Sequence, residues 1–118
     1  MRKSVIFIIL CIFLSFGSVY ANSIDKDWSD KAIEIILDIG ENIENDDYTY
    51  RQFFALREAI CECVKPLKDT YRQQNFSGQV ITNVAIGMAD HDKYRLNQAL
   101  IILQINTNNY SNGLVLIR

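Results

Sequence analysis

Residues 28–43 read WSDKAIEIILDIGENI, and the fold prediction starts from this stretch. Its apolar residues return every three or four positions, which at about 100° per residue places them on one side of an α-helix. The residues of this stripe are Trp28, Ala32, Ile35, Ile36, Ile39 and Ile43. Ile33 and Leu37 widen it to about 200° of arc. We therefore expect a helix, capped by Asp27, that lies centrally or has a second apolar face for a partner.

The remaining side of this helix is acidic. Its acids are Asp30, Glu34, Asp38 and Glu41. Residues 25–47 carry nine acids against two lysines, a net charge of −7, whereas residues 48–118 carry five acids and eight bases, a net of +3. A solvated face beside a basic helix would explain this asymmetry. Alternatively, the four acids form a binding face for a cationic protein partner, and we treat them as candidate site residues.

A second helix is expected from Thr49 to Lys65. Its apolar stripe consists of Phe53, Leu56, Ile60 and Val64, again at helical spacing. Pro66 lacks a backbone donor and its ring clashes with the preceding turn, so the helix should kink or end there.

Cys61 and Cys63 lie two positions apart on this second helix, so their side chains point about 200° apart. They can therefore neither form a disulfide with each other nor hold one metal ion from one face. Cys63 falls beside the apolar stripe and should be buried. Cys61 falls on the side of Tyr50 and Phe54, and these three residues are predicted to form an apolar ridge for partner binding. An exposed Cys61 would have to find a disulfide partner in another molecule, for example a second copy.

The last third of the chain is ambiguous. Residues 67–74 fit a short helix and residues 75–78 (NFSG) fit a turn. Residues 79–88 fit either a helix capped by Ser77 or a strand, because β-branched residues are frequent there. A further helix should begin near Asp90–Asp92, and residues 114–118 (LVLIR) should form a short strand or the stub of a helix.

These segments together predict a mainly α fold, a small bundle of about four helices. The alternative is an α+β fold with two helices followed by a three-stranded antiparallel meander.

The N-terminus has the three parts of a secretory signal peptide. A basic start (Met1 to Lys3) precedes the apolar residues 5–16, and small residues at positions 19 and 21 favour cleavage after Ala21. The apolar run is shorter than the roughly 20 residues that span a bilayer. We expect residues 1–21 to be removed, leaving residues 22–118 as one small helical domain, secreted or periplasmic, without a stable membrane anchor.

Catalytic, metal and cofactor chemistry is not predicted. The chain has one histidine, His91, between two aspartates, and a capping segment at a helix boundary explains this pattern. There is no phosphate-binding loop, dinucleotide fingerprint or cysteine-hydrolase signature. The acidic N-terminal half argues against nucleic-acid binding, which requires a basic surface.

The sequence therefore predicts an exported, non-catalytic protein-binding module. Its size and acidity fit an inhibitor or immunity-type protein that binds a cationic partner, or a helical protein that self-associates as a homodimer. The alternative is a carrier of an apolar small molecule between the helices.

Overall fold

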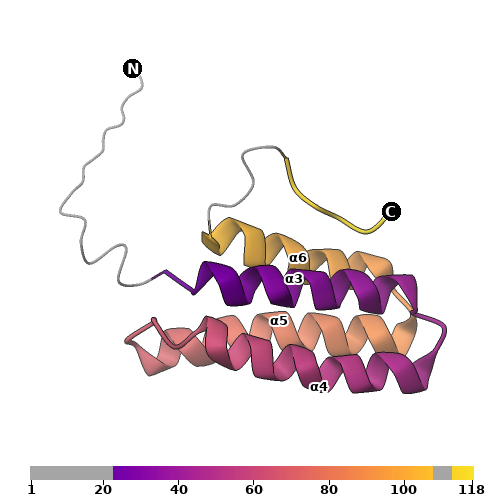
Figure 1. Cartoon of the computed structure of the whole chain (residues 1–118), viewed down its shortest axis with the longest axis horizontal. Coiled ribbons are helices and arrows are strands. Elements are labelled where there is room, and N and C mark those ends of the chain that lie inside the picture. Colours follow the sequence, from indigo (N-terminus) through magenta and orange to yellow (C-terminus); the bar gives the residue numbers. More distant parts are fainter. Residues whose placement is uncertain (1–22, 108–112) are drawn as a thin grey trace.

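The structure is a computed structural model that describes residues 23–107 and 113–118. Within these residues the chain contains no β-strand and forms the helices α3 (Lys26–Glu41), α4 (Asp46–Cys63), α5 (Thr70–Asp90) and α6 (Lys93–Thr107) (Figure 1). The predicted mainly α bundle is confirmed. The alternative meander is wrong, because residues 79–105 lie in α5 and α6 apart from a two-residue corner. The predicted signal peptide, residues 1–21, lies outside the described residues.

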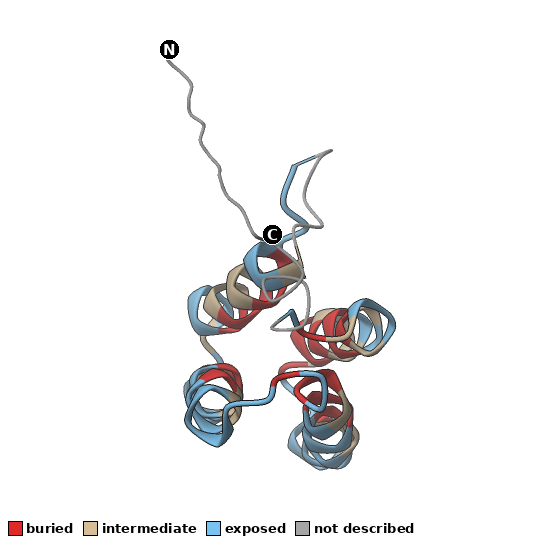
Figure 2. Cartoon of the chain, turned by 90° about the vertical axis from the view of Figure 1, so that its left-hand side faces the viewer, coloured by how far each residue is buried: buried red, intermediate tan, exposed pale blue. Residues whose placement is uncertain are grey.

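The helices form two hairpins that pack side by side. α3 pairs with α4, and α5 pairs with α6. α3 also packs along α6, and α4 along α5, so that the four helices surround a common centre (Figure 2). Of these four contacts, the one between α4 and α5 is the least extensive.

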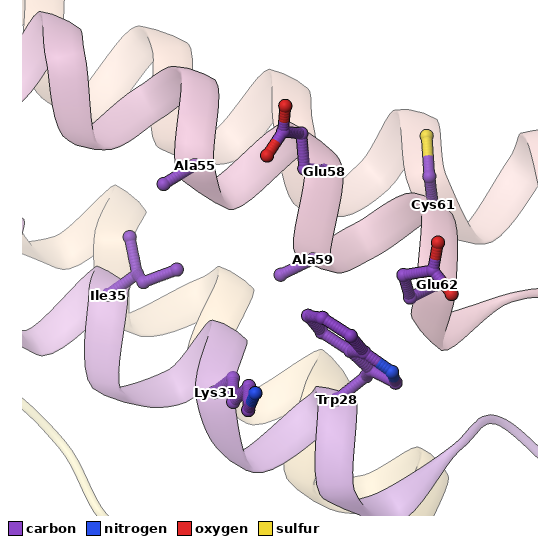
Figure 3. A pocket seen from close by; sticks show the side chains of 8 residues that line it. All are labelled: Trp28, Lys31, Ile35, Ala55, Glu58, Ala59, Cys61 and Glu62. Atoms are coloured by element: carbon purple, nitrogen blue, oxygen red, sulfur yellow. The ribbon is translucent and has the colours of Figure 1, made fainter.

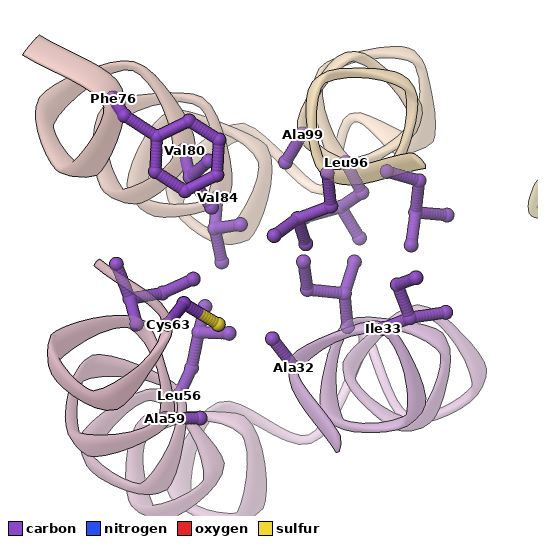
Figure 4. Packing of buried hydrophobic residues seen from close by; sticks show 14 of the residues in the cluster. Ala32, Ile33, Leu56, Ala59, Cys63, Phe76, Val80, Val84, Leu96 and Ala99 are labelled. Carbon is purple, nitrogen blue, oxygen red and sulfur yellow. The ribbon is translucent and has the colours of Figure 1, made fainter. Parts of the chain in front are cut away.

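Aliphatic side chains from all four helices fill the centre of the bundle (Figure 4). The fully buried ones include Ile36 and Ile39 of α3, Leu56 and Ile60 of α4, Val80 and Val84 of α5, and Leu96, Leu100 and Leu103 of α6. Burying one such side chain contributes about 1.5–3 kcal/mol. Cys61 and Cys63 are both free thiols, so apolar burial stabilises the described part of the chain without a disulfide.

α3 begins two residues earlier than expected, because Asp25 rather than Asp27 is its N-cap. The Asp25 carboxylate accepts a hydrogen bond from the Trp28 amide at 3.0 Å. Both aspartates suit the position, and tertiary contacts favour the earlier one. Ile24 is thereby buried, and the Asp25 amide donates to the Cys63 carbonyl at 2.9 Å, which ties the start of α3 to the end of α4.

α4 ends before Pro66, as predicted, but α5 is one continuous helix where a short helix, a turn and a second segment were expected. The turn prediction for residues 75–78 is wrong, and Ser77 lies inside the helix instead of capping it. Asp69 is the N-cap and accepts from the Tyr71 amide at 2.9 Å. Phe76 and Val80 are buried on the same side of this helix, and that burial outweighs the turn preference of the residues around Gly78.

A tight corner joins α5 to α6. His91 ends α5 in the left-handed conformation, with φ of 51°, and the Asp92 amide donates to the Gly87 carbonyl at 2.8 Å. The Asp92 carboxylate accepts from the Tyr94 amide at 2.9 Å, so the helix start predicted near Asp90–Asp92 is confirmed. Gly87 allows this approach, because a Cβ there would lie 2.7 Å from a methyl group of Leu96.

Residues 113–118 run back along α6 as an extended segment, neither strand nor helix as had been expected (Figure 1). Two side-chain amides of α6 hold its backbone. Asn97 donates to the Ile117 carbonyl at 2.9 Å and accepts from the Ile117 amide at 2.7 Å. Gln104 likewise donates to the Val115 carbonyl at 2.9 Å and accepts from the Val115 amide at 2.8 Å. On the other side of the segment, the Ile117 side chain packs against Gly40 of α3.

Candidate partner-binding site

The two cysteines lie on opposite sides of α4, as helical geometry predicts. Cys63 is fully buried and Cys61 is exposed. Burial raises the pKa of the Cys63 thiol to about 12, and the charges of Asp25 and Glu62 add to this. Cys63 is therefore an un-ionised packing residue at neutral pH, and only Cys61 presents a thiol to solvent.

Two of the three residues of the predicted apolar ridge lie together. Tyr50 and Phe54 are 59% and 51% exposed, and their ring centroids are 5.0 Å apart at an interplanar angle of 82°. This edge-to-face arrangement is a favourable one for aromatic side chains. Cys61 lies two turns, about 10 Å, further along α4. The structure thus gives an exposed aromatic pair, with Cys61 separate from it.

A groove of about 340 Å³ lies beside this aromatic pair, between α4 and α5. It is lined by Asp46, Thr49, Tyr50, Phe53, Ala85, Met88 and Ala89. Most of these side chains are apolar, and α4 and α5 pack least closely of all neighbouring helices. This groove could not be predicted from the sequence, because its two sides lie about forty residues apart and meet only in the folded chain.

Three acidic residues lie at or near the groove in the sequence. Glu44, Asp46 and Asp47, here called the acidic corner, are exposed, and Asp46 also lines the groove. His91 reaches this corner from α5. Its Nε2 lies 3.1 Å from an Asp46 carboxylate oxygen and its Nδ1 lies 3.3 Å from one of Glu44.

The hydrogen bond to Asp46, together with the charges of both acids, raises the pKa of His91 above its ordinary value of 6.5 despite some desolvation. The sequence placed His91 in a capping segment, which is correct, but its partners lie 45 and 47 positions away and could not be read from the chain.

The four acids predicted as a binding face of α3 have different environments. Asp38 accepts from the Tyr48 hydroxyl at 2.5 Å, from Gln52 at 2.7 Å and from the Asn42 side chain at 3.2 Å. It therefore lies in the α3–α4 interface as a structural acceptor. Asp30 forms an ion pair with Lys26 at 3.0 Å. Glu34 and Glu41 are exposed, so the structure leaves these two as the open acids of that face.

A second depression, of about 530 Å³, lies between α3 and α4 (Figure 3). Trp28, Ile35, Ala55 and Ala59 supply its apolar surface. The ammonium group of Lys31 lies 4.4 Å from the centroid of the Trp28 ring, which is a cation–π contact. Cys61 stands at the rim of this depression, and in Figure 3 its sulfur points away from Trp28.

Among the described residues, no three His, Cys, Asp or Glu side chains converge as metal ligands. Within the same residues, no helix has the length and apolar character needed to cross a membrane. The chain matches no protein-family model, no curated protein and no solved structure.

Proposed function

We propose that this protein is an exported, non-catalytic binding module whose α4–α5 groove takes an apolar and cationic segment of a protein partner. One observation carries the proposal: an apolar groove with an exposed aromatic pair at its rim adjoins a cluster of exposed acids. The export part rests on the signal-peptide pattern of the N-terminus.

The groove suits an amphipathic helix or a short apolar anchor. Phe53 and Met88 offer an apolar floor, and Met adapts well to different partner shapes. Tyr50, which also lines the groove, is one of the residue types enriched among those that dominate binding energy at interfaces. The acidic corner would attract a basic residue next to that anchor and accelerate association at low salt. An inhibitor or immunity-type protein directed at a cationic partner would use such a surface.

Site-specific photocrosslinking tests this proposal. A benzophenone amino acid replaces Met88 in the groove or, as a matched control on the same helix, the exposed Tyr71, which does not line the groove. We expect a defined protein adduct from position 88 and none from position 71. Tyr50→Ala and Asp47→Lys should each reduce the adduct, whereas Glu34→Lys on α3 should not.

Loss of the adduct with Glu34→Lys but not with Asp47→Lys would contradict the groove and favour the acidic face of α3 instead. The absence of any adduct specific to position 88 in the exported fraction would overturn the proposal.

A carrier of an apolar small molecule is the second candidate. The depression between α3 and α4 has a volume within the range of small-molecule sites, and its apolar surface includes Trp28, the sole tryptophan of the chain. If the protein is a carrier, titration with dodecanol should change the fluorescence of Trp28 in a saturable way. Ala55→Phe, which fills the depression, should abolish that change, and an unsaturable response in both proteins would exclude the carrier function.

A further inference from the structure

The extended segment 113–118 has one satisfied backbone edge and one open edge. Val115 and Ile117 direct both their N–H and C=O groups to Gln104 and Asn97. In an extended chain, successive residues direct these groups to opposite sides. The backbone groups of Leu114 and Leu116 therefore form the other edge, and they have no hydrogen-bond partner among residues 23–107 and 113–118.

Exposed apolar side chains lie on the segment and on the neighbouring surface of α6. Leu114, Val115 and Leu116 are 42%, 48% and 40% exposed. Tyr94 and Ile105 are also exposed, and on α6 they lie within about 80° of Asn97, on the side that holds the segment. Five of the eight exposed large apolar residues in the described part of the chain thus gather here. An open strand edge with apolar flanks is a template for pairing with another extended chain.

The segment is complementary to itself. Leu114-Val115-Leu116 reads the same in both directions, so two copies can pair antiparallel about a two-fold axis that passes between their Val115 residues. Each Leu114 then faces Leu116 of the other copy, and all four residues present their open backbone groups to each other. The two Val115 residues face each other across the axis, and each keeps its own bonds to Gln104.

The charges around the segment agree with this arrangement. Glu41, Lys93 and Arg118 all line one depression beside Ile117, so its charged side chains carry a net positive charge within one copy. Ile117 contacts Gly40 of α3. Val115 lies two extended residues before Ile117, a distance of about four helical residues, so Val115 is level with a point about four residues before Gly40. The two-fold axis then carries Arg118 towards the first half of α3 of the other copy, where Glu34 is an exposed acid that a basic residue can approach, whereas Asp30 is already paired with Lys26.

We propose that residues 114–116 of two copies pair as antiparallel strands and join the bundles into a homodimer. The dimer surface lies on the side of the bundle formed by α3 and α6, whereas the groove lies between α4 and α5. Each copy in the dimer therefore keeps its groove open for a partner. The dimer is also independent of any disulfide through Cys61.

Hydrogen exchange as a function of concentration tests the pairing. We use protein purified from cells that express the full chain, in reductant. At low concentration the amides of Val115 and Ile117 should be protected and those of Leu114 and Leu116 should exchange freely. At concentrations where sedimentation shows a dimer, the Leu114 and Leu116 amides should become protected as well. A monomer at all concentrations up to the millimolar range would overturn the proposal.

Leu116→Pro is the matched variant, because it removes an outward N–H and leaves the amides of Val115 and Ile117 in place. By symmetry it deletes two intermolecular bonds, so the dissociation constant should rise about tenfold or more. Leu116→Lys, which adds charge at the same edge, serves as a second variant. Dimerisation equal to that of the original chain in both variants would contradict the pairing.

Cysteine scanning tests the register in a Cys11→Ser, Cys61→Ser background. Val115→Cys should form an intermolecular disulfide on mild oxidation, because non-hydrogen-bonded pairs have Cα atoms about 4.5 Å apart. Leu114→Cys and Leu116→Cys should each remain reduced alone and should cross-link when mixed. Cross-linking of Leu114→Cys with itself, at a rate equal to that of Val115→Cys, would exclude the proposed register.

Discussion

The hydroxyl group of Tyr48 lies 2.5 Å from a carboxylate oxygen of Asp38 and donates a hydrogen bond to it across the α3–α4 interface. Gln52 donates to the same oxygen at 2.7 Å. Helical spacing had placed Asp38 with the solvated acids of α3, yet two donors from α4 surround it. Hydrogen bonds to a charged acceptor are stronger than neutral ones, so this carboxylate fixes how the two helices of the first hairpin meet.

Replacing Asp38 should destabilise the bundle. Asp38→Ala leaves the Tyr48 hydroxyl and the Gln52 amide without their acceptor, and we expect the melting temperature to fall by about 5–15 °C. Thermal unfolding followed by circular dichroism measures this. Glu34→Ala, which removes an exposed acid from the same helix, is the control and should change the melting temperature by less than about 2 °C. Equal effects of the two substitutions would contradict a structural role for Asp38.

The contact of His91 with the acidic corner should make stability depend on pH. Because the folded state raises the pKa of His91 above 6.5, protonated His91 favours folding. This contribution is complete below about pH 6.5, the unfolded value, and is lost as the pH rises through the higher folded value. The difference in melting temperature between the original chain and His91→Asn should therefore be larger at pH 5.5 than at pH 9.

Asn is the appropriate replacement because it tolerates the left-handed backbone of position 91. Titration of the His91 ring by NMR provides a direct reading, and its pKa should fall towards 6.5 in Asp46→Asn. If the pKa is unchanged in Asp46→Asn, the ion pair does not form in solution.

The two thiols of α4 should react at very different rates. With a pKa of about 12, only about one Cys63 thiol in ten thousand is ionised at pH 8, and its side chain is fully buried. In a Cys11→Ser background, a chromogenic disulfide reagent should titrate one thiol in the native protein and a second one in denaturant. Cys61→Ser should remove the fast reaction, whereas two fast thiols in the native protein would show that α4 frays at its end.

Glycines 78 and 87 should respond to alanine in opposite directions. A Cβ at Gly78 would meet nothing within 4 Å, so Gly78→Ala should stabilise α5 by about 0.5–1 kcal/mol through helix propensity. A Cβ at Gly87 would lie 3.0 Å from the Asp92 carbonyl oxygen and still closer to Leu96. Gly87→Ala should therefore destabilise by about 1–3 kcal/mol. Denaturant unfolding measures both, and stabilisation by Gly87→Ala would contradict the tight α5–α6 corner.

Some features of the fold followed from local periodicity, whereas others depended on distant contacts. The stripes around Ile36 and Ile60 have a regular helical period, so both helices and the inward side of Cys63 were predictable. Residues 75–78 have turn-forming side chains, and the burial of Phe76 and Val80 in the assembled bundle favours the helix over the turn.

The candidate site was less predictable than the fold. The Tyr50–Phe54 pair follows from one helix surface and was found, although Cys61 proved separate from it. The groove wall at Met88 and the contacts of His91 require two hairpins to meet. Gln104 is a polar residue within an apolar helix, so the sequence indicates that it needs a hydrogen-bond partner. The sequence does not identify that partner as Val115.

The hairpin architecture also has a kinetic consequence. Each hairpin joins helices separated by only a few residues, so most native contacts form between neighbours in sequence. Loop closure then costs little entropy, and helical proteins of this kind fold within about milliseconds or faster. Among the extensive helix–helix contacts of the described residues, only the one between α3 and α6 joins helices that are far apart in the sequence. The two hairpins should therefore collapse first, and the docking of α6 with its extended segment onto α3 should complete folding.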